Sequence, residues 1–111
     1  MRTTGKLNLS SALKVKILDI GDWNMDTTAS VSIPHGLNLT SIRGWSVVIR
    51  DDANANYRQE PFITAGVPDS LIVSQVDATN VGITRAASSV FDSVNFDSTS
   101  FNRGWITIYY A

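Results

Sequence analysis

The chain has 111 residues, a formal net charge of −1 and no cysteine. This length is typical of one domain with a single core. The lack of cysteine excludes disulfides, thiolate metal sites and cysteine nucleophiles. Because acidic and basic residues nearly balance, there is no electrostatic footprint for a phosphate backbone or an anionic membrane. We therefore expect neither nucleic acid nor a membrane as a partner.

The N-terminal residues are polar and show no periodic pattern of apolar positions. No continuous apolar stretch there is long enough for a signal peptide or a membrane span. Terminal arms of this kind lie outside the core unless a neighbour holds them. We expect residues 1–11 to form an N-terminal arm that attaches the protein to others, and residues 12–111 to form one domain.

The first two apolar runs alternate with polar residues, as half-buried strands do. In residues 10–18, Val15 and Ile17 alternate with two lysines. Residues 29–36 place Val31 and Ile33 inward, and the run ends near Pro34, which cannot donate to a strand ladder. Both segments are predicted to be strands.

The strongest strand signal is residues 41–50, "SIRGWSVVIR". A strict alternation puts Trp45, Val47 and Ile49 on one face, and it puts Ile42, Gly44, Ser46 and Val48 on the other. The next segment, "DDANAN", is rich in residues that bond to their own backbone in turns. Residues 57–62 are predicted to be a short edge strand closed by a proline.

In the turn "DDANANY", Asp52, Asn54 and Asn56 have the alternate spacing of a calcium loop. Tyr57 stands where an EF-hand needs glycine, and Ile63 stands where it needs a bidentate glutamate. We interpret the segment as a turn and expect no metal site.

Residues 71–76 and 81–86 are two β-rich runs separated by "DATN", which predicts an antiparallel hairpin with a four-residue loop. Residues 105–110, "WITIYY", have large side chains on both faces and are predicted to be a central strand covered on both sides. About six to seven short strands without a long helix indicate an all-β fold, a small antiparallel β-sandwich of jelly-roll or similar type.

Between the hairpin and the last strand, phenylalanine recurs every fifth residue, at Phe91, Phe96 and Phe101. This spacing gives a stripe neither on a helix nor on a strand. Aspartate, asparagine and serine surround the rings, and these residues satisfy loop backbones locally. We expect a long surface loop anchored by the rings, which serves either as a packed Ω-loop or as a contact between subunits.

Catalytic chemistry finds little support in the sequence. His35 is the only histidine, so no histidine cluster is present for zinc. No nucleophile elbow, phosphate-binding glycine loop or HExxH helix occurs. We expect no enzymatic activity and no cofactor.

A candidate contact site begins at "GDWNMD", where Trp23 interrupts a polar loop. An exposed ring beside carboxylates and amides is suited to stacking on a sugar, whereas tryptophan in a small β domain is more often a core or interface plug. Arginines at 43, 50, 58 and 103 suit contacts between subunits. The candidate glycan or partner contacts are Asp22, Trp23, Asn24, Tyr57, Arg58 and Arg103.

The segments "KVKILDIGDWNMDTTASVSIPHGL", "IRGWSVVIRDD" and "FNRGWITIYY" together resemble a module of bacteriophage tail-fibre and virion surface proteins, over residues 13–111. The "PHGL" strand end, the strand with a central tryptophan and the closing "RGWITIYY" also resemble the trimeric sandwich of the H-type lectins. The resemblance implies a homotrimeric virion component with no catalytic residues to transfer. Lectins of that type bind N-acetylgalactosamine at subunit boundaries, but their sugar contacts have no residue-by-residue match here.

Long shafts and heptads are missing, which distinguishes this chain from an ordinary tail fibre. We therefore expect a short virion protein, such as a head fibre, decoration protein, or tail-fibre or baseplate tip, assembled in the host cytoplasm and attached to other virion proteins by its arm. The alternative is a lectin-like module that binds bacterial surface glycans.

Overall fold

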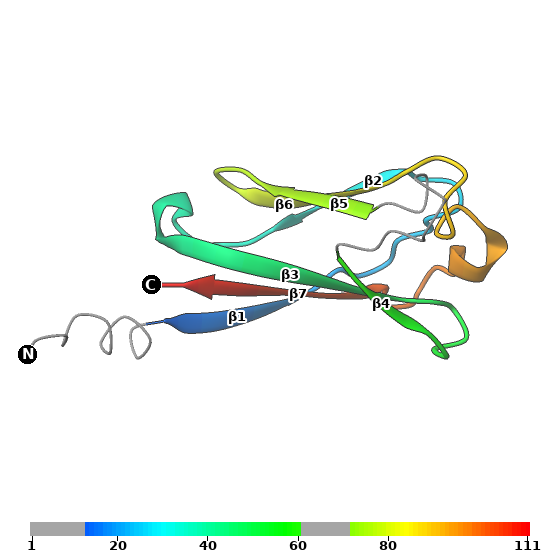
Figure 1. The fold of residues 1–111 in the computed structure, drawn as a ribbon, viewed down its shortest axis with the longest axis horizontal. Helices are drawn as coiled ribbons and strands as arrows, with labels where there is room; N and C mark the ends of the chain where they lie inside the picture. Colours follow the sequence, from blue (N-terminus) through cyan, green and yellow to red (C-terminus); the bar gives the residue numbers. More distant parts are fainter. Residues whose placement is uncertain (1–12, 61–71) are drawn as a thin grey trace, which may run out of the picture.

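A computed structural model describes residues 13–60 and 72–111 of the chain (Figure 1). The predicted arm at residues 1–11 and the end of the predicted strand 57–62 lie outside these residues. Within them the chain forms seven strands: β1 (Lys14–Asp19), β2 (Ser30–Pro34), β3 (Ile42–Arg50), β4 (Tyr57–Gln59), β5 (Ile72–Val76), β6 (Asn80–Arg85) and β7 (Gly104–Tyr110). Two short 3₁₀ helices, η1 (Leu39–Ser41) and η3 (Val94–Phe96), lie in connections.

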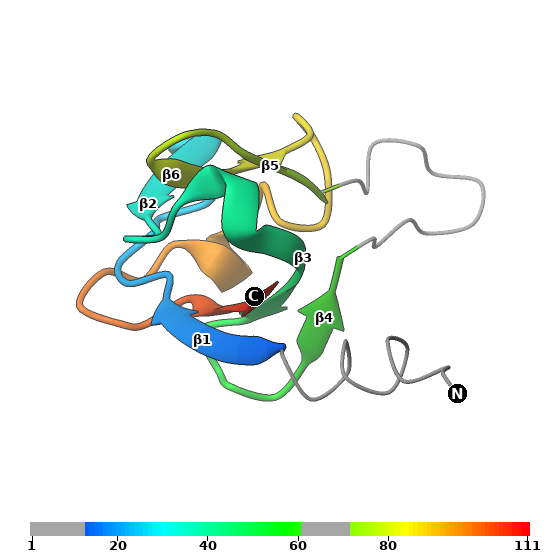
Figure 2. The same cartoon turned by 90° about the vertical axis from the view of Figure 1, so that its left-hand side faces the viewer.

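The strands form two antiparallel sheets, in the orders β1-β7-β3-β4 and β2-β6-β5. The sheets are stacked as two layers, which Figures 1 and 2 show from two directions. This arrangement confirms the predicted all-β fold with two antiparallel sheets. The central position of β7, the edge position of β4 and the β5–β6 hairpin are also as the sequence predicts.

Alternate residues of both sheets build the core between the layers. Val47 and Ile49 on β3 pair with Ile106 and Gly104 on β7, and these side chains face Val81 and Ile83 of the other sheet in one buried cluster. A branched side chain at every second position of a pleated strand gives this layer its continuous apolar surface. Hydrophobic burial between the two sheets is therefore the main source of stability.

Two details of the strand faces differ from the predictions. The register of β3 shifts between Ile42 and Gly44, and this irregularity turns Ile42 toward the core instead of the outside. On β1, where the alternation predicts a strand but not which face is buried, Val15 and Ile17 are 55% and 63% exposed, whereas Leu18 packs against the core. The expectation that β7 is covered on both sides is also wrong for its outer face, where Tyr109 is 41% exposed.

Gly104 begins β7 at a very close approach to β3. A Cβ atom at this position would overlap the carbonyl oxygen of Val48 and crowd Ile49. Glycine is therefore required here by space, because any side chain would force the two strands apart. This contact fixes the entry of β7 into the sheet, directly after the loop described next.

Candidate functional site

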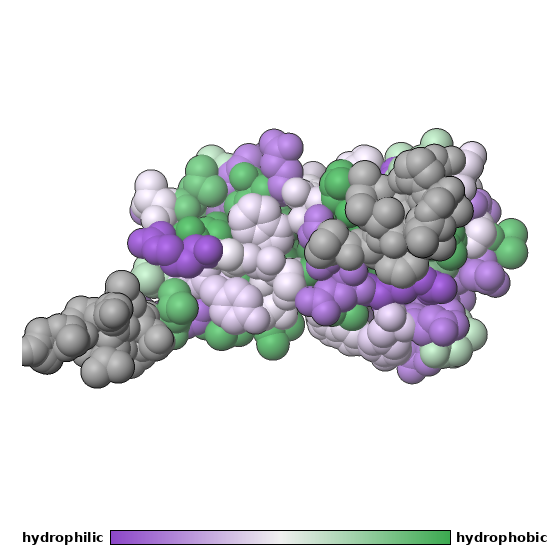
Figure 3. Space-filling model, viewed as in Figure 1, coloured by the Kyte–Doolittle hydropathy of each residue, from purple (hydrophilic) through white to green (hydrophobic). Residues whose placement is uncertain are grey.

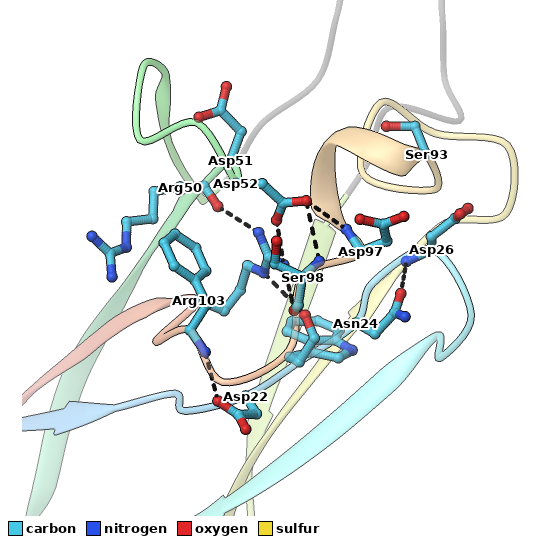
Figure 4. Close-up of polar contacts among 12 residues, drawn as sticks. Asp22, Asn24, Asp26, Arg50, Asp51, Asp52, Ser93, Asp97, Ser98 and Arg103 are labelled. Atoms are coloured by element: carbon cyan, nitrogen blue, oxygen red, sulfur yellow. Dashed lines mark hydrogen bonds and ion pairs between the residues drawn. The ribbon is translucent and has the colours of Figure 1, made fainter.

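Three connections meet at one end of the sandwich: residues 20–29 between β1 and β2, residues 51–56 between β3 and β4, and residues 86–103 between β6 and β7 (Figure 4). The carboxylate of Asp22 accepts a hydrogen bond from the Phe101 amide at 2.9 Å, and Asp22 forms a bridge with Asn102. The Asp52 amide donates to the Asn95 carbonyl at 2.9 Å, and the Asp52 carboxylate accepts from the amides of Asp97 and Ser98 at 3.0 and 3.1 Å. Carboxylates of the shorter connections thus hold the backbone of the long one.

The guanidinium of Arg103 lies at the centre of this end and is fully buried. It donates to the backbone carbonyls of Trp23 and Arg50, each at 3.0 Å, and to that of Ser98 at 3.3 Å. Its Nη2 also forms an ion pair with Asp52 Oδ1 at 2.9 Å. One side chain therefore ties all three connections together, as the dashed lines in Figure 4 show.

The carboxylate of Asp52 is held in its charged form. Burial alone would raise its pKa, but the hydrogen bond from Arg103 and the amides of Ser98 and Asp97 outweigh that effect and lower the pKa below its ordinary value. Asp97 shows the opposite shift. Desolvation and then the neighbouring Asp52 raise the pKa of Asp97.

The β3–β4 turn contains a second ordered carboxylate. Asp51 accepts hydrogen bonds from the Ala55 and Asn56 amides at 2.9 and 3.3 Å and from Asn56 Nδ2 at 3.1 Å. Burial opposes ionisation, but these donors prevail and lower the pKa of Asp51. These contacts match the interpretation of this segment as a turn, since the oxygens that a cation would need are used within the protein.

Two of the three periodic phenylalanines are anchors of the long loop. Phe91 and Phe96 are buried and meet edge to face with ring centroids 5.3 Å apart. Phe101 is partly exposed and lies against the guanidinium of Arg50, 4.2 Å from its ring centroid. The burial of the first two fits a role as loop anchors and leaves them no surface for a subunit contact.

The remaining candidate contacts serve mostly structural purposes. Trp23 is 3% exposed and its Nε1 donates to the Thr28 carbonyl, so this ring fills the core and is not open to stacking on a sugar. Asn24 accepts from the amides of Asp26 and Thr27 and caps a turn. Arg103 is too enclosed to touch a ligand, which corrects its assignment as a glycan contact.

Sequence reasoning missed a second buried arginine, because no local pattern marks it. Arg85 at the end of β6 is 8% exposed and donates to the Met25 carbonyl at 2.7 Å, and it forms an ion pair with Asp92 at 3.4 Å. It ties the start of the long loop to the β1–β2 connection. Asp52 was likewise missed, because its carboxylate was considered only as a calcium ligand and not as the partner of Arg103.

His35 also has a structural role. Its Nδ1 accepts a hydrogen bond from the Leu37 amide at 3.0 Å, and its Nε2 lies 2.9 Å from the Asp77 carbonyl, to which it donates in that tautomer. The ring is 1% exposed. With both nitrogens used and no access for solvent, this histidine cannot act as an acid or base toward a substrate.

Tyr57 is the one candidate contact with a widely exposed ring, at 53%. It stacks on Trp105 with ring centroids 6.1 Å apart, and the guanidinium of Arg50 lies 5.1 Å from the Trp105 ring centroid. Arg58, on the opposite face of β4, lies 5.7 Å from the Phe96 ring centroid. Tyr57 thus belongs to an aromatic group on the outside of the four-stranded sheet. It does not belong to the loop end, the end of the sandwich where the three connections meet.

We use the name outer face for the solvent side of the four-stranded sheet. It consists of alternate residues of its strands: Val15 to Asp19 on β1, Trp105 to Tyr109 on β7, Gly44 to Arg50 on β3, and Tyr57 and Gln59 on β4. Asp19 and Arg50 are its only charged residues. Hydrophobic side chains, green in Figure 3, reach the surface along the lower edge of the left half of the molecule.

No group of three or more histidine, aspartate or glutamate residues is placed to hold a metal ion within residues 13–60 and 72–111. In the same residues, no helix has the length and apolar character needed to cross a membrane. In comparisons with known proteins, no family model, curated protein or solved structure matches the chain.

Proposed function

We propose that the chain is a structural surface protein of a bacteriophage particle that works by self-assembly and attachment, and that its copies contact one another through the outer face. The single observation that carries the assembly is the composition of this face. Val15, Ile17 and Tyr109 are each at least 41% exposed on neighbouring strands, with Trp105 and Tyr57 further along the same surface. Soluble monomers seldom expose contiguous apolar surface of this kind without a partner.

The residue types also fit a protein–protein interface. Aromatic residues and arginine are enriched at the centres of such interfaces, while lysine and glutamate are depleted. The outer face has three aromatic residues and no lysine or glutamate, and its arginine is held against Phe101 and Trp105.

A second copy of the chain is the partner that the charges favour. One aspartate and one arginine give the outer face no net charge, so two copies of it do not repel each other. A symmetric oligomer built on such a face is the usual outcome for a small soluble protein. The resemblance to phage surface modules supports the particle as the location and a trimer as the assembly.

The loop end supports a structural role rather than catalysis. Its central arginine and Asp52 use their polar atoms on each other and on backbone groups. No step of bond making or breaking is assigned to these residues. Attachment to other virion proteins is assigned to the predicted arm at residues 1–11.

The assembly is tested by a pair of matched substitutions read by light scattering. Ile17→Lys places a charge on the outer face at a side chain that is 63% exposed, and Val94→Lys makes the same change at a side chain that is 70% exposed on η3. We expect Ile17→Lys to reduce the mass to that of one chain and Val94→Lys to leave the mass of the wild type. If both variants keep the same mass as the wild type, the outer face is not the interface.

The location is tested with antibodies against the purified chain. We expect them to label the surface of purified phage particles in electron micrographs. Their absence from particles that contain all other structural proteins would contradict a virion role.

A further inference from the structure

The outside of the three-stranded sheet carries a hollow that the proposed assembly does not use. It encloses about 340 Å³ and is lined by Ser32, Val73, Ser74, Gln75, Asp77, Gly82 and Thr84. Gly82 lies on the central strand β6, directly between Ser32 on β2 and Gln75 on β5. The hollow exists because Gly82, the middle residue of the three paired residues Ser32, Gly82 and Gln75, has no side chain.

Nothing in the fold requires glycine at this position. Gly21 and Gly36 have positive φ angles of 81° and 68°, and Gly104 meets the Val48 carbonyl, so each of these needs to be glycine. At Gly82, a Cβ atom would find its nearest neighbours at 3.9 and 4.0 Å, an ordinary contact distance. Glycine weakens a strand interior and often marks a place where a ligand approaches the backbone.

The lining offers neutral hydrogen-bonding groups around this floor. Within the described part of the chain, the side chains of Ser32 and Gln75 have no hydrogen-bond partner, whereas the Thr84 hydroxyl is paired with Ser30 at 2.9 Å. Hydroxyl and amide groups both donate and accept. Val73, which is 45% exposed, supplies an apolar wall.

Charge narrows the class of ligand. Among the residues that the structure describes, the lining has no lysine or arginine, and its one ionisable residue is Asp77, whose carboxylate accepts the Thr79 and Asn80 amides at 2.9 and 2.7 Å. A phosphate, sulfate or carboxylate would therefore meet a negative charge and no cation. A single carboxylate is also too little for a metal ion.

We propose that the hollow over Gly82 binds a neutral sugar residue of a glycan, with its hydroxyls on Ser32, Gln75 and Asp77 and its apolar side on Val73 and the glycine backbone. The volume is at the low end of small-molecule sites, which are roughly 300 to 1,000 Å³. Because the hollow is open and its described lining has no aromatic ring, we expect affinity on the order of millimolar for one site. Assembly of several copies would raise the avidity.

The proposal is tested by nitrogen–proton correlation spectra of the ¹⁵N-labelled full chain during titration with saccharides. The probes are a neutral hexose, an N-acetylhexosamine and a disaccharide of the two, with inorganic phosphate as the charged comparison. We expect at least one saccharide to shift the amide signals of Ser32, Gln75 and Gly82, and phosphate to leave them in place. No shift with any saccharide, shifts elsewhere only, or a stronger response to phosphate would overturn it.

Gly82→Val fills the hollow with a residue that strands favour, and we expect it to weaken saccharide binding by about tenfold or more. Ala53→Val is the control, since it adds apolar bulk at an exposed turn residue that lies outside both the hollow and the outer face. If Gly82→Val does not fold, the double change Ser32→Ala and Gln75→Ala replaces it, because both side chains are exposed. Equal binding by wild type and the filled or double variant would contradict the site. The titration does not depend on oligomer mass, so its failure leaves the assembly proposal standing.

Discussion

Arg103 and Asp52 form an ion pair, 2.9 Å between Nη2 and Oδ1, in which the arginine is fully buried and the aspartate is 19% exposed. The two residues lie on different connections, and the same guanidinium also reaches carbonyls of Trp23, Arg50 and Ser98. The pair holds the three connections together, since one guanidinium serves both these carbonyls and this carboxylate.

Arg103→Met is expected to destabilise the protein by about 3–5 kcal/mol, because it leaves a partly buried carboxylate and three carbonyls without their donor. Arg43→Met is the control, since Arg43 is exposed and donates only to nearby backbone. Its cost is expected to stay within about 0.5 kcal/mol. Urea unfolding measures both free energies. Equal losses for the two variants would show that the buried network contributes nothing special.

Acid is expected to weaken the fold through Asp51 and Asp52. Both have pKa values lowered in the folded state, so their stabilisation is complete above the ordinary aspartate pKa and is lost as the pH falls through the lower folded values. Asp52→Asn is expected to lower the stability at neutral pH and to flatten its fall below about pH 4. Urea unfolding from neutral to strongly acidic pH measures this. An unchanged slope in the variant would contradict the lowered pKa of Asp52.

Asp97 is expected to act in the opposite direction. The pKa of Asp97 is raised in the folded state, because its charged form is disfavoured there. The contribution of Asp97 to the free energy of unfolding is therefore fully present below the ordinary aspartate pKa. This contribution is lost as the pH rises through the folded pKa. Asp97→Asn is expected to raise the melting temperature at neutral pH and to leave it unchanged in strong acid. A lower melting temperature at neutral pH would show that the charge is favourable where it lies.

Gly104→Ala is expected to cost about 3 kcal/mol or more, because its Cβ would collide with the backbone of β3. Gly82→Ala is the matched control on the other sheet and is expected to leave the stability unchanged or to raise it by up to about 1 kcal/mol, because its Cβ meets no close neighbour. Thermal unfolding distinguishes the two. Similar melting temperatures for both variants would mean that β3 and β7 shift apart at little cost.

The alternation of apolar residues was enough to predict the two-sheet fold and the place of most strands. Val31 and Ile33 face inward as the pattern indicates, and the hairpin around "DATN" has the predicted antiparallel pairing. Alternation failed where the strand was irregular, because the register shift before Gly44 reversed Ile42. On β1 the alternation predicted the strand but could not show which face is buried, and Val15 and Ile17 face outward while Leu18 packs against the core.

The loop end was harder to predict because its contacts join residues far apart in the sequence. Asp52 and Arg103 are separated by about half the chain, and nothing local in either segment indicates the ion pair. The aromatic period correctly indicated an anchored loop, since Phe91 and Phe96 are buried. The periodic residues did not reveal that aspartates of other connections hold the backbone of this loop.

The central claim, that copies of the chain cover one another's outer face, is tested most directly by thiol reactivity. Because the chain has no cysteine, Ile17→Cys and Val94→Cys each introduce a single thiol at an exposed position on a different surface. As the protein concentration rises, we predict that a water-soluble thiol reagent modifies position 17 progressively more slowly, while the rate at position 94 stays constant. Rates that are independent of concentration at both positions would contradict the claim.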